Sequence, residues 1–119
     1  MSKEVLSAPA LLAMFVAGTW AMPSMLYTPK SVDELQLMTY GELIMDANMA
    51  CVQALATPWR LRESREYIER IGRVVRHRAQ LATMPAWVNA YGEAMTPDTP
   101  GERCTDVTIM ALKAGKGIP

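Results

Sequence analysis

The chain has 119 residues, of which 50% are hydrophobic and 20% are charged, and its formal net charge at pH 7 is zero. This length fits a single domain, and the balanced charge excludes any global electrostatic argument for binding to nucleic acid or to an anionic membrane. A net charge near zero also gives little protection against association, which favours a subunit of a complex over a free, abundant protein. The ten methionines supply adaptable apolar side chains that suit irregular packing and contact surfaces.

The chain begins with a long uncharged stretch. No charged residue occurs from Val5 to Pro29, so this segment must leave water. As a signal peptide, it could be cleaved near Ala21. As a membrane element, it has about the 20 uncharged residues that a spanning helix needs, with Trp20 and Tyr27 as interfacial aromatic residues and Lys30 as a flanking charge. As a helix that is apolar on all sides, it would pack against other protein.

We favour the packing interpretation. Residues 1–30 are therefore expected to form an apolar packing or membrane helix that is not cleaved, followed by a helical bundle domain over residues 31–119. Buried large side chains contribute about 1.5–3 kcal/mol each, so contacts of this helix with other chains would be strong. The expected partner-contact residues of the segment are Leu11, Phe15, Trp20, Met22 and Met25.

A capping box predicts the start of the next helix. Ser31 can accept a hydrogen bond from the backbone of Glu34, and the Glu34 carboxylate can reach back to Ser31. We therefore predict a helix over residues 31–56. Its apolar stripe at helical spacing comprises Leu35, Met38, Met45, Met49 and Val52, and the stripe is widened by Leu43, Ile44 and Ala47.

The third predicted helix covers residues 58–82, with Thr57 as its cap and Pro58 in its first turn, where the missing N–H costs nothing. Between Arg60 and Arg78 it holds seven arginines against three glutamates. Its predicted apolar stripe consists of Leu61, Ile68, Ile71 and Val75.

The arginine-rich helix allows three interpretations. A solvated face with pairs such as Glu66–Arg70 and Glu69–Arg73 is favoured. A protein interface comes second, because the preceding helix is acidic. Binding to nucleic acid comes last, since no recognition helix follows. In the interface interpretation, the residues that orient the partner are Arg65, Arg73 and Arg76.

Two shorter helices are predicted to end the chain. The first covers residues 86–95, and a turn rich in proline and threonine follows it. A second capping box, formed by Thr99 and Glu102, predicts a last helix over residues 100–114 that stops at Gly115. No segment alternates like a strand, so the predicted fold is all-α, a small bundle of four to five helices with an apolar N-terminal helix.

The two cysteines, Cys51 and Cys104, lie on different predicted helices. In an oxidising compartment they could form one disulfide, which would contribute roughly 3–5 kcal/mol in the chain-entropy model. They could equally be two buried thiols, because free cysteine is among the most buried residue types.

No catalytic or metal-binding pattern stands out. His77 is the only histidine, so a zinc site is not expected, and no serine or cysteine has a visible neighbouring base. We expect no cofactor and no enzymatic activity.

The expected function is that of a non-enzymatic helical subunit of a virion or a membrane-associated machine. It would act by protein–protein packing in a homo-oligomer or larger complex, with the membrane a further partner for residues 5–29. One alternative is a secreted periplasmic helical protein with one disulfide. Another is a small cytoplasmic inhibitor or nucleic-acid-binding protein that uses the arginine-rich helix.

Overall fold

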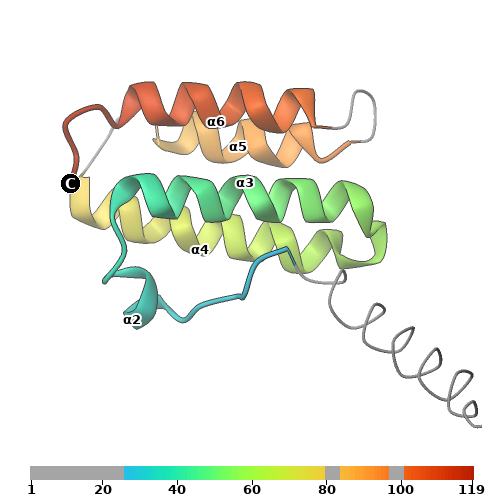
Figure 1. Cartoon of the computed structure of the whole chain (residues 1–119), viewed down its shortest axis with the longest axis horizontal. Coiled ribbons are helices and arrows are strands. Elements are labelled where there is room, and N and C mark those ends of the chain that lie inside the picture. Colours follow the sequence, from blue (N-terminus) through green and yellow to red (C-terminus); the bar gives the residue numbers. More distant parts are fainter. Residues whose placement is uncertain (1–25, 80–83, 97–100) are drawn as a thin grey trace, which may run out of the picture.

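The structure is a computed structural model that describes residues 26–79, 84–96 and 101–119. Its helices pack as two antiparallel pairs, α3 beside α4 and α5 beside α6 (Figure 1). No strand occurs in these three ranges, and the protein is a small all-α bundle, as the sequence predicts. In chain order the elements are α2 (Val32–Leu35), α3 (Tyr40–Ala56), the short 3-10 helix η1 (Pro58–Arg60), α4 (Leu61–Ala79), α5 (Met84–Ala94) and α6 (Glu102–Ala114).

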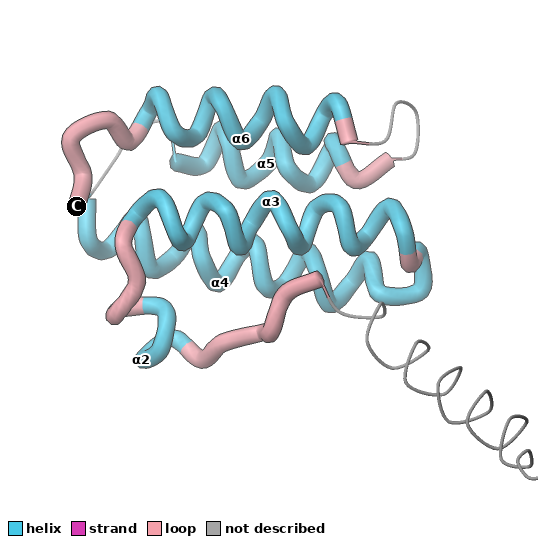
Figure 2. The backbone as a smooth tube through the Cα atoms, viewed as in Figure 1, coloured by secondary structure: helices cyan, strands magenta, loops and turns pink. Residues whose placement is uncertain are grey.

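The single helix predicted over residues 31–56 is wrong, because a loop divides it into α2 and α3 (Figure 2). The capping box of Ser31 and Glu34 is present, but the helix that it starts ends after one turn. A second capping box, overlooked in the sequence, starts α3: the Thr39 side chain accepts from the Glu42 backbone, and the Glu42 carboxylate accepts from the Thr39 backbone. These bonds satisfy the orphan donors of a new helix, so a helix start at Thr39 competes with continuation from α2.

The buried face of α3 also differs from the prediction. Met45 and Met49 were expected in the apolar stripe, but they are 45% and 38% exposed. The centre of the core instead lies along the residues that were expected only to widen the stripe, together with small side chains that allow neighbouring helices to approach closely. The fully or nearly fully buried residues of α3 are Tyr40, Leu43, Ile44, Ala47, Ala50, Cys51, Gln53 and Ala54.

The arginine-rich helix begins close to its predicted position. Pro58 occupies the first turn of η1, which leads directly into α4. Thr57 makes no capping hydrogen bond with its side chain, because its hydroxyl donates to the Gln53 carbonyl at 2.7 Å. The predicted apolar stripe of α4 is confirmed at its centre, since Ile68, Ile71 and Val75 are buried.

The last two helices confirm the prediction in outline. Helix α5 begins two residues before the predicted 86–95. Helix α6 begins at Glu102 with Gly101 at its N-cap, rather than at residue 100. Thr99, which was predicted to cap this helix, lies outside the described residues. The predicted stop at Gly115 is confirmed.

Candidate interaction surface

An extended strap, residues 26–31, crosses the groove between α3 and α4. Its first residue is held by α3, because the Leu26 N–H donates to Gln53 Oε1 at 2.6 Å. The Gln53 amide is fully buried and donates in turn to the Thr57 hydroxyl at 2.8 Å. A buried amide whose donor and acceptor groups are both used holds the backbone of the strap in one place.

Asp46 of α3 connects the strap to α4. Its Oδ2 accepts from Lys30 Nζ at 3.1 Å and from the Tyr67 hydroxyl at 2.7 Å. Burial, helped by the neighbouring Asp46 carboxylate, raises the pKa of Tyr67 far above its ordinary value, so the hydroxyl stays protonated and donates. The Arg70 guanidinium lies over the Tyr67 ring and donates to the Lys30 carbonyl at 2.7 Å.

Tyr27 belongs to the core. Its ring stacks on Tyr67 with the ring centroids 4.9 Å apart, and its hydroxyl is hydrogen-bonded to Ser64 at 3.3 Å. Tyr27 is 6% exposed, and Lys30 is paired with Asp46. Both side chains are therefore engaged by α3 and α4, and the membrane interpretation of the segment stays a prediction.

The sequence contained a signal for this attachment that was overlooked. Asp46 and Gln53 are polar residues of α3 whose side chains bond to the strap. They are seven residues apart, and that spacing places them on the same helix face. Polar groups on such a face need partners, and the strap provides them.

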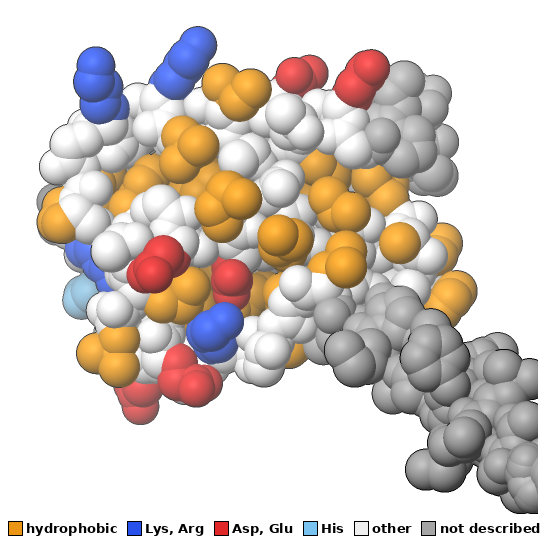
Figure 3. All heavy atoms as spheres, viewed as in Figure 1, with side chains coloured by type: hydrophobic (Ala, Val, Ile, Leu, Met, Phe, Trp, Pro, Cys, Tyr) orange, Lys and Arg blue, Asp and Glu red, His pale blue; other side chains and the backbone are white. Residues whose placement is uncertain are grey.

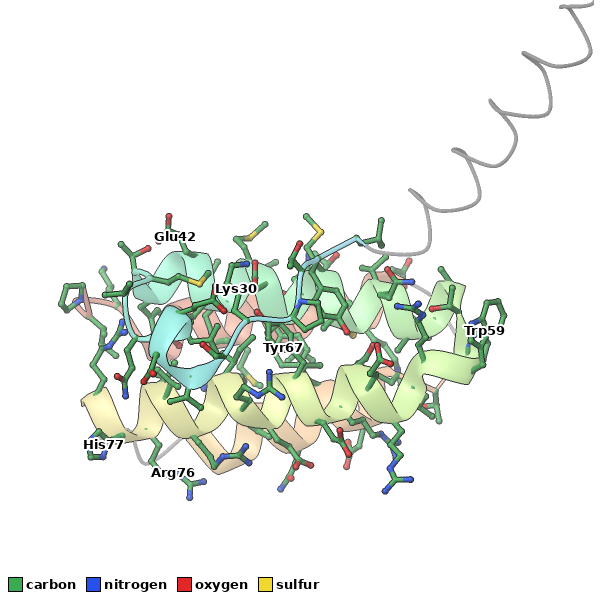
Figure 4. All side chains as sticks on the ribbon, turned by 90° about the horizontal axis from the view of Figure 1, so that it is seen from below. Lys30, Glu42, Trp59, Tyr67, Arg76 and His77 are labelled. Carbon is green, nitrogen blue, oxygen red and sulfur yellow. A yellow bond between two sulfur atoms is a disulfide. The ribbon has the colours of Figure 1, made fainter. Side chains whose placement is uncertain are left out.

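The arginines of α4 divide into two groups. Arg70 and Arg78 point toward the strap and α2, where they donate to backbone carbonyls. Arg65, Arg73 and Arg76 are exposed, and Arg76 points away from the bundle beside His77 (Figure 4). The pattern of a solvated face therefore fits Arg73 and Arg76, whereas Arg65 also donates to the Gly92 carbonyl of α5 at 3.4 Å.

Ion pairing along α4 also differs from the expectation. Instead of Glu66–Arg70, the pair that forms is Arg62–Glu66 at 3.6 Å. Arg70 is held by the strap, which explains why Glu66 has no access to it. A pair this exposed contributes little to stability.

Arg78 fixes the loop that separates α2 from α3. Its Nη1 donates to the Met38 carbonyl at 2.8 Å, and its Nη2 donates to the Gln36 carbonyl at 2.9 Å. These carbonyls follow the end of α2, where backbone acceptors lack helical partners. A guanidinium suits this position because it presents several donors in a rigid fork.

We predict that Arg78→Ala lowers the free energy of unfolding by about 1–2 kcal/mol, the range for losing hydrogen bonds from a charged donor at a partly buried site. Arg76→Ala is the matched control, because Arg76 lies on the same helix but is exposed, and its effect should stay within about 0.5 kcal/mol. Urea denaturation measures both. Equal midpoints for the two variants would show that Arg78 does not hold the loop.

Cys51 of α3 and Cys104 of α6 form a disulfide, with their Cα atoms 5.9 Å apart. Both residues are fully buried. One turn further along α6, the Thr108 hydroxyl is hydrogen-bonded to the Tyr91 hydroxyl at 2.8 Å. Burial raises the pKa of Tyr91 to about 12, so this hydroxyl remains neutral at physiological pH. The disulfide and this polar contact together join α6 to both of its neighbours.

An exposed apolar surface lies where α3 and α6 run side by side. We call it the α3/α6 face and define it by Met45, Met49, Ile109 and Leu112, all of which are exposed. A shallow groove lined in part by Met38, Met45 and Leu112 connects the two helices. Figure 3 shows this side of the bundle, with hydrophobic side chains gathered over α3 and α6. Contiguous exposed apolar surface of this kind is typical of interaction sites.

The expected contact residues fall into two sets. Leu11, Phe15, Trp20, Met22 and Met25 lie outside the described residues. Arg65, Arg73 and Arg76 lie on α4, away from the α3/α6 face, so the structure does not bring them together with it.

The helices of the described ranges include none with the length and hydrophobicity to cross a membrane. Within the same ranges, no group of three or more His, Cys, Asp or Glu side chains could hold a metal ion.

Comparison of the chain with protein-family models, with curated proteins and with solved structures finds no match.

Proposed function

We propose that this protein is a non-enzymatic structural subunit that assembles with other protein chains through its apolar N-terminal segment. The observation that carries the proposal is the strap. The uncharged stretch from Val5 continues directly into Leu26 and Tyr27, which are bonded to α3 and packed on α4. The segment is therefore continuous in sequence with residues that are fixed on the bundle, so a partner that binds the segment is held close to the bundle.

The apolar content of the segment supports the same proposal. Its large side chains include Leu11, Phe15 and Trp20, whose burial against a partner would contribute on the order of 10 kcal/mol before entropy is subtracted. The described bundle already has its own core of buried residues from α2 to α6. A partner chain offers the apolar surface that this segment needs.

The disulfide favours a particular setting for this assembly. Disulfides persist outside the reducing cytoplasm and are rare within it, and Cys51–Cys104 uses both cysteines of the chain. We propose that the bundle works in an oxidising compartment, such as the periplasm or the surface of a virion. The cytoplasmic inhibitor or nucleic-acid-binding alternative is less well supported, because two arginines of α4 are directed inward by the strap and by α2.

The test uses the full chain in detergent-free buffer. We expect the parent protein to sediment as an oligomer and Leu11→Glu/Phe15→Glu to sediment as a folded monomer, since charges in the segment oppose its burial. These substitutions leave the strap intact, whereas removal of residues 1–29 would delete part of it. A parent chain that is monomeric, or a double variant that assembles as the parent does, would contradict the proposal.

A further inference from the structure

The α3/α6 face brings together four exposed hydrophobic side chains from two neighbouring helices. Its four defining residues, Met45, Met49, Ile109 and Leu112, are between 38% and 46% exposed. Met38 and Val52 extend the face as partly buried neighbours. Methionine side chains are flexible and polarizable, so they adapt to an irregular apolar partner. Three charged residues line the groove at one edge of the face: Lys30 and Asp46 pair with each other, and the Glu42 carboxylate accepts from the Thr39 N–H.

This face meets the point where the uncharged segment enters the bundle. Leu26 is bonded to Gln53, which lies one turn beyond Met49 on α3, and Leu26 is itself 45% exposed. From Val5 to Met25 the chain carries no charge. The same molecule thus combines an uncharged segment in its sequence with an exposed apolar face on its described bundle.

We propose that the α3/α6 face binds residues 5–25 of a second copy of this chain. This inference rests on the proposed function and names its partner. The sizes agree, because 17 residues of α3 extend over about 25 Å and a helix of residues 5–25 would extend over about 30 Å. Each copy contributes one segment and one face. If two copies exchange their segments, each segment is buried on the face of the other copy, and the result is a closed dimer.

The direction of the strap favours a second copy over the chain's own segment. Leu26 contacts Gln53 near the end of α3, whereas Lys30 contacts Asp46 two turns earlier. The strap therefore runs antiparallel to α3, and at Leu26 its direction, followed back toward lower residue numbers, points to the C-terminal end of α3. Binding to the same copy would require the chain to reverse immediately, whereas a neighbouring copy can receive the segment without a reversal.

Complementation between two variants tests the inference. The face variant, Met45→Glu/Leu112→Glu, keeps an intact segment. The segment variant, Leu11→Glu/Phe15→Glu, keeps an intact face. We expect the parent to self-associate, each variant alone to be monomeric by sedimentation velocity, and an equimolar mixture to form a heterodimer. The control, Leu37→Glu, alters a side chain that is 88% exposed on the loop after α2 and should behave as the parent does.

The other outcomes separate the two proposals. Self-association of the face variant at the parent's level would overturn this inference and leave the proposed function standing. Self-association of the segment variant would overturn the proposed function itself. A mixture that stays monomeric would show that the segment of one copy does not bind the face of another. Co-sedimentation of a monomeric parent with phosphatidylcholine vesicles would show that the partner of the segment is a lipid surface. Either result overturns the exchange. Met49→Lys/Ile109→Lys provides a second face variant if the first fails to fold.

Discussion

Replacing both cysteines by alanine should lower the free energy of unfolding by about 4 kcal/mol, the largest effect that we expect from any substitution outside the segment. Cys51 and Cys104 are separated by 53 positions in the sequence, and closing a loop of that length removes much of the conformational entropy of the unfolded chain. Alanine suits both sites because they are fully buried and it introduces no unpaired polar group. Urea denaturation of the double variant and the parent gives the difference.

Reduction provides the control for this prediction. The parent protein in dithiothreitol should unfold at nearly the same urea concentration as the double alanine variant, because both lack the cross-link. An oxidised parent whose midpoint does not change on reduction would show that the disulfide contributes nothing to stability.

Gly115→Ala should destabilise the bundle by about 2–3 kcal/mol, toward the upper end of the range for overpacking a core. A Cβ at this position would overlap with ring atoms of Tyr40. The Tyr40 ring cannot move aside easily, because it is 3% exposed and its hydroxyl donates to the Ala111 carbonyl. The Tyr40 backbone N–H also donates to the Pro119 carbonyl at 2.9 Å, so a shift of this residue would disturb the end of the chain.

Gly41→Ala is the matched control for this substitution. Gly41 lies within α3, and a Cβ there would meet no atom within 4 Å. Alanine favours a helix over glycine by about 0.8–1 kcal/mol, so this variant should be more stable than the parent. Thermal unfolding of the two variants should therefore shift in opposite directions. A shift of both variants to higher temperature would show that Tyr40 does not pack on Gly115.

Local chemistry in the sequence determined most of the helices. The Ser31–Glu34 capping box, Pro58 and Gly115 act through nearby backbone groups, so their effects can be predicted without any tertiary contact. The apolar spacing of Ile68, Ile71 and Val75 likewise specified the buried side of α4. The overlooked start of α3 was also written locally, in Thr39 and Glu42. The all-α class follows from these signals.

The tertiary structure alone decided which polar and apolar side chains face inward. The periodicity of apolar residues shows which of them share a helix face, but not which neighbouring helices that face meets. Helix α3 packs on both α4 and α6. Leu43 and Ile44 face those helices, and Met45 and Met49 are therefore exposed. The roles of Arg70 and Arg78 depend on carbonyls about 40 positions away in the sequence. The pairing of Cys51 with Cys104 similarly required α3 and α6 to be neighbours. Such contacts are set by how the helices dock, because hydrogen bonds and disulfides depend on distances that only the folded chain defines.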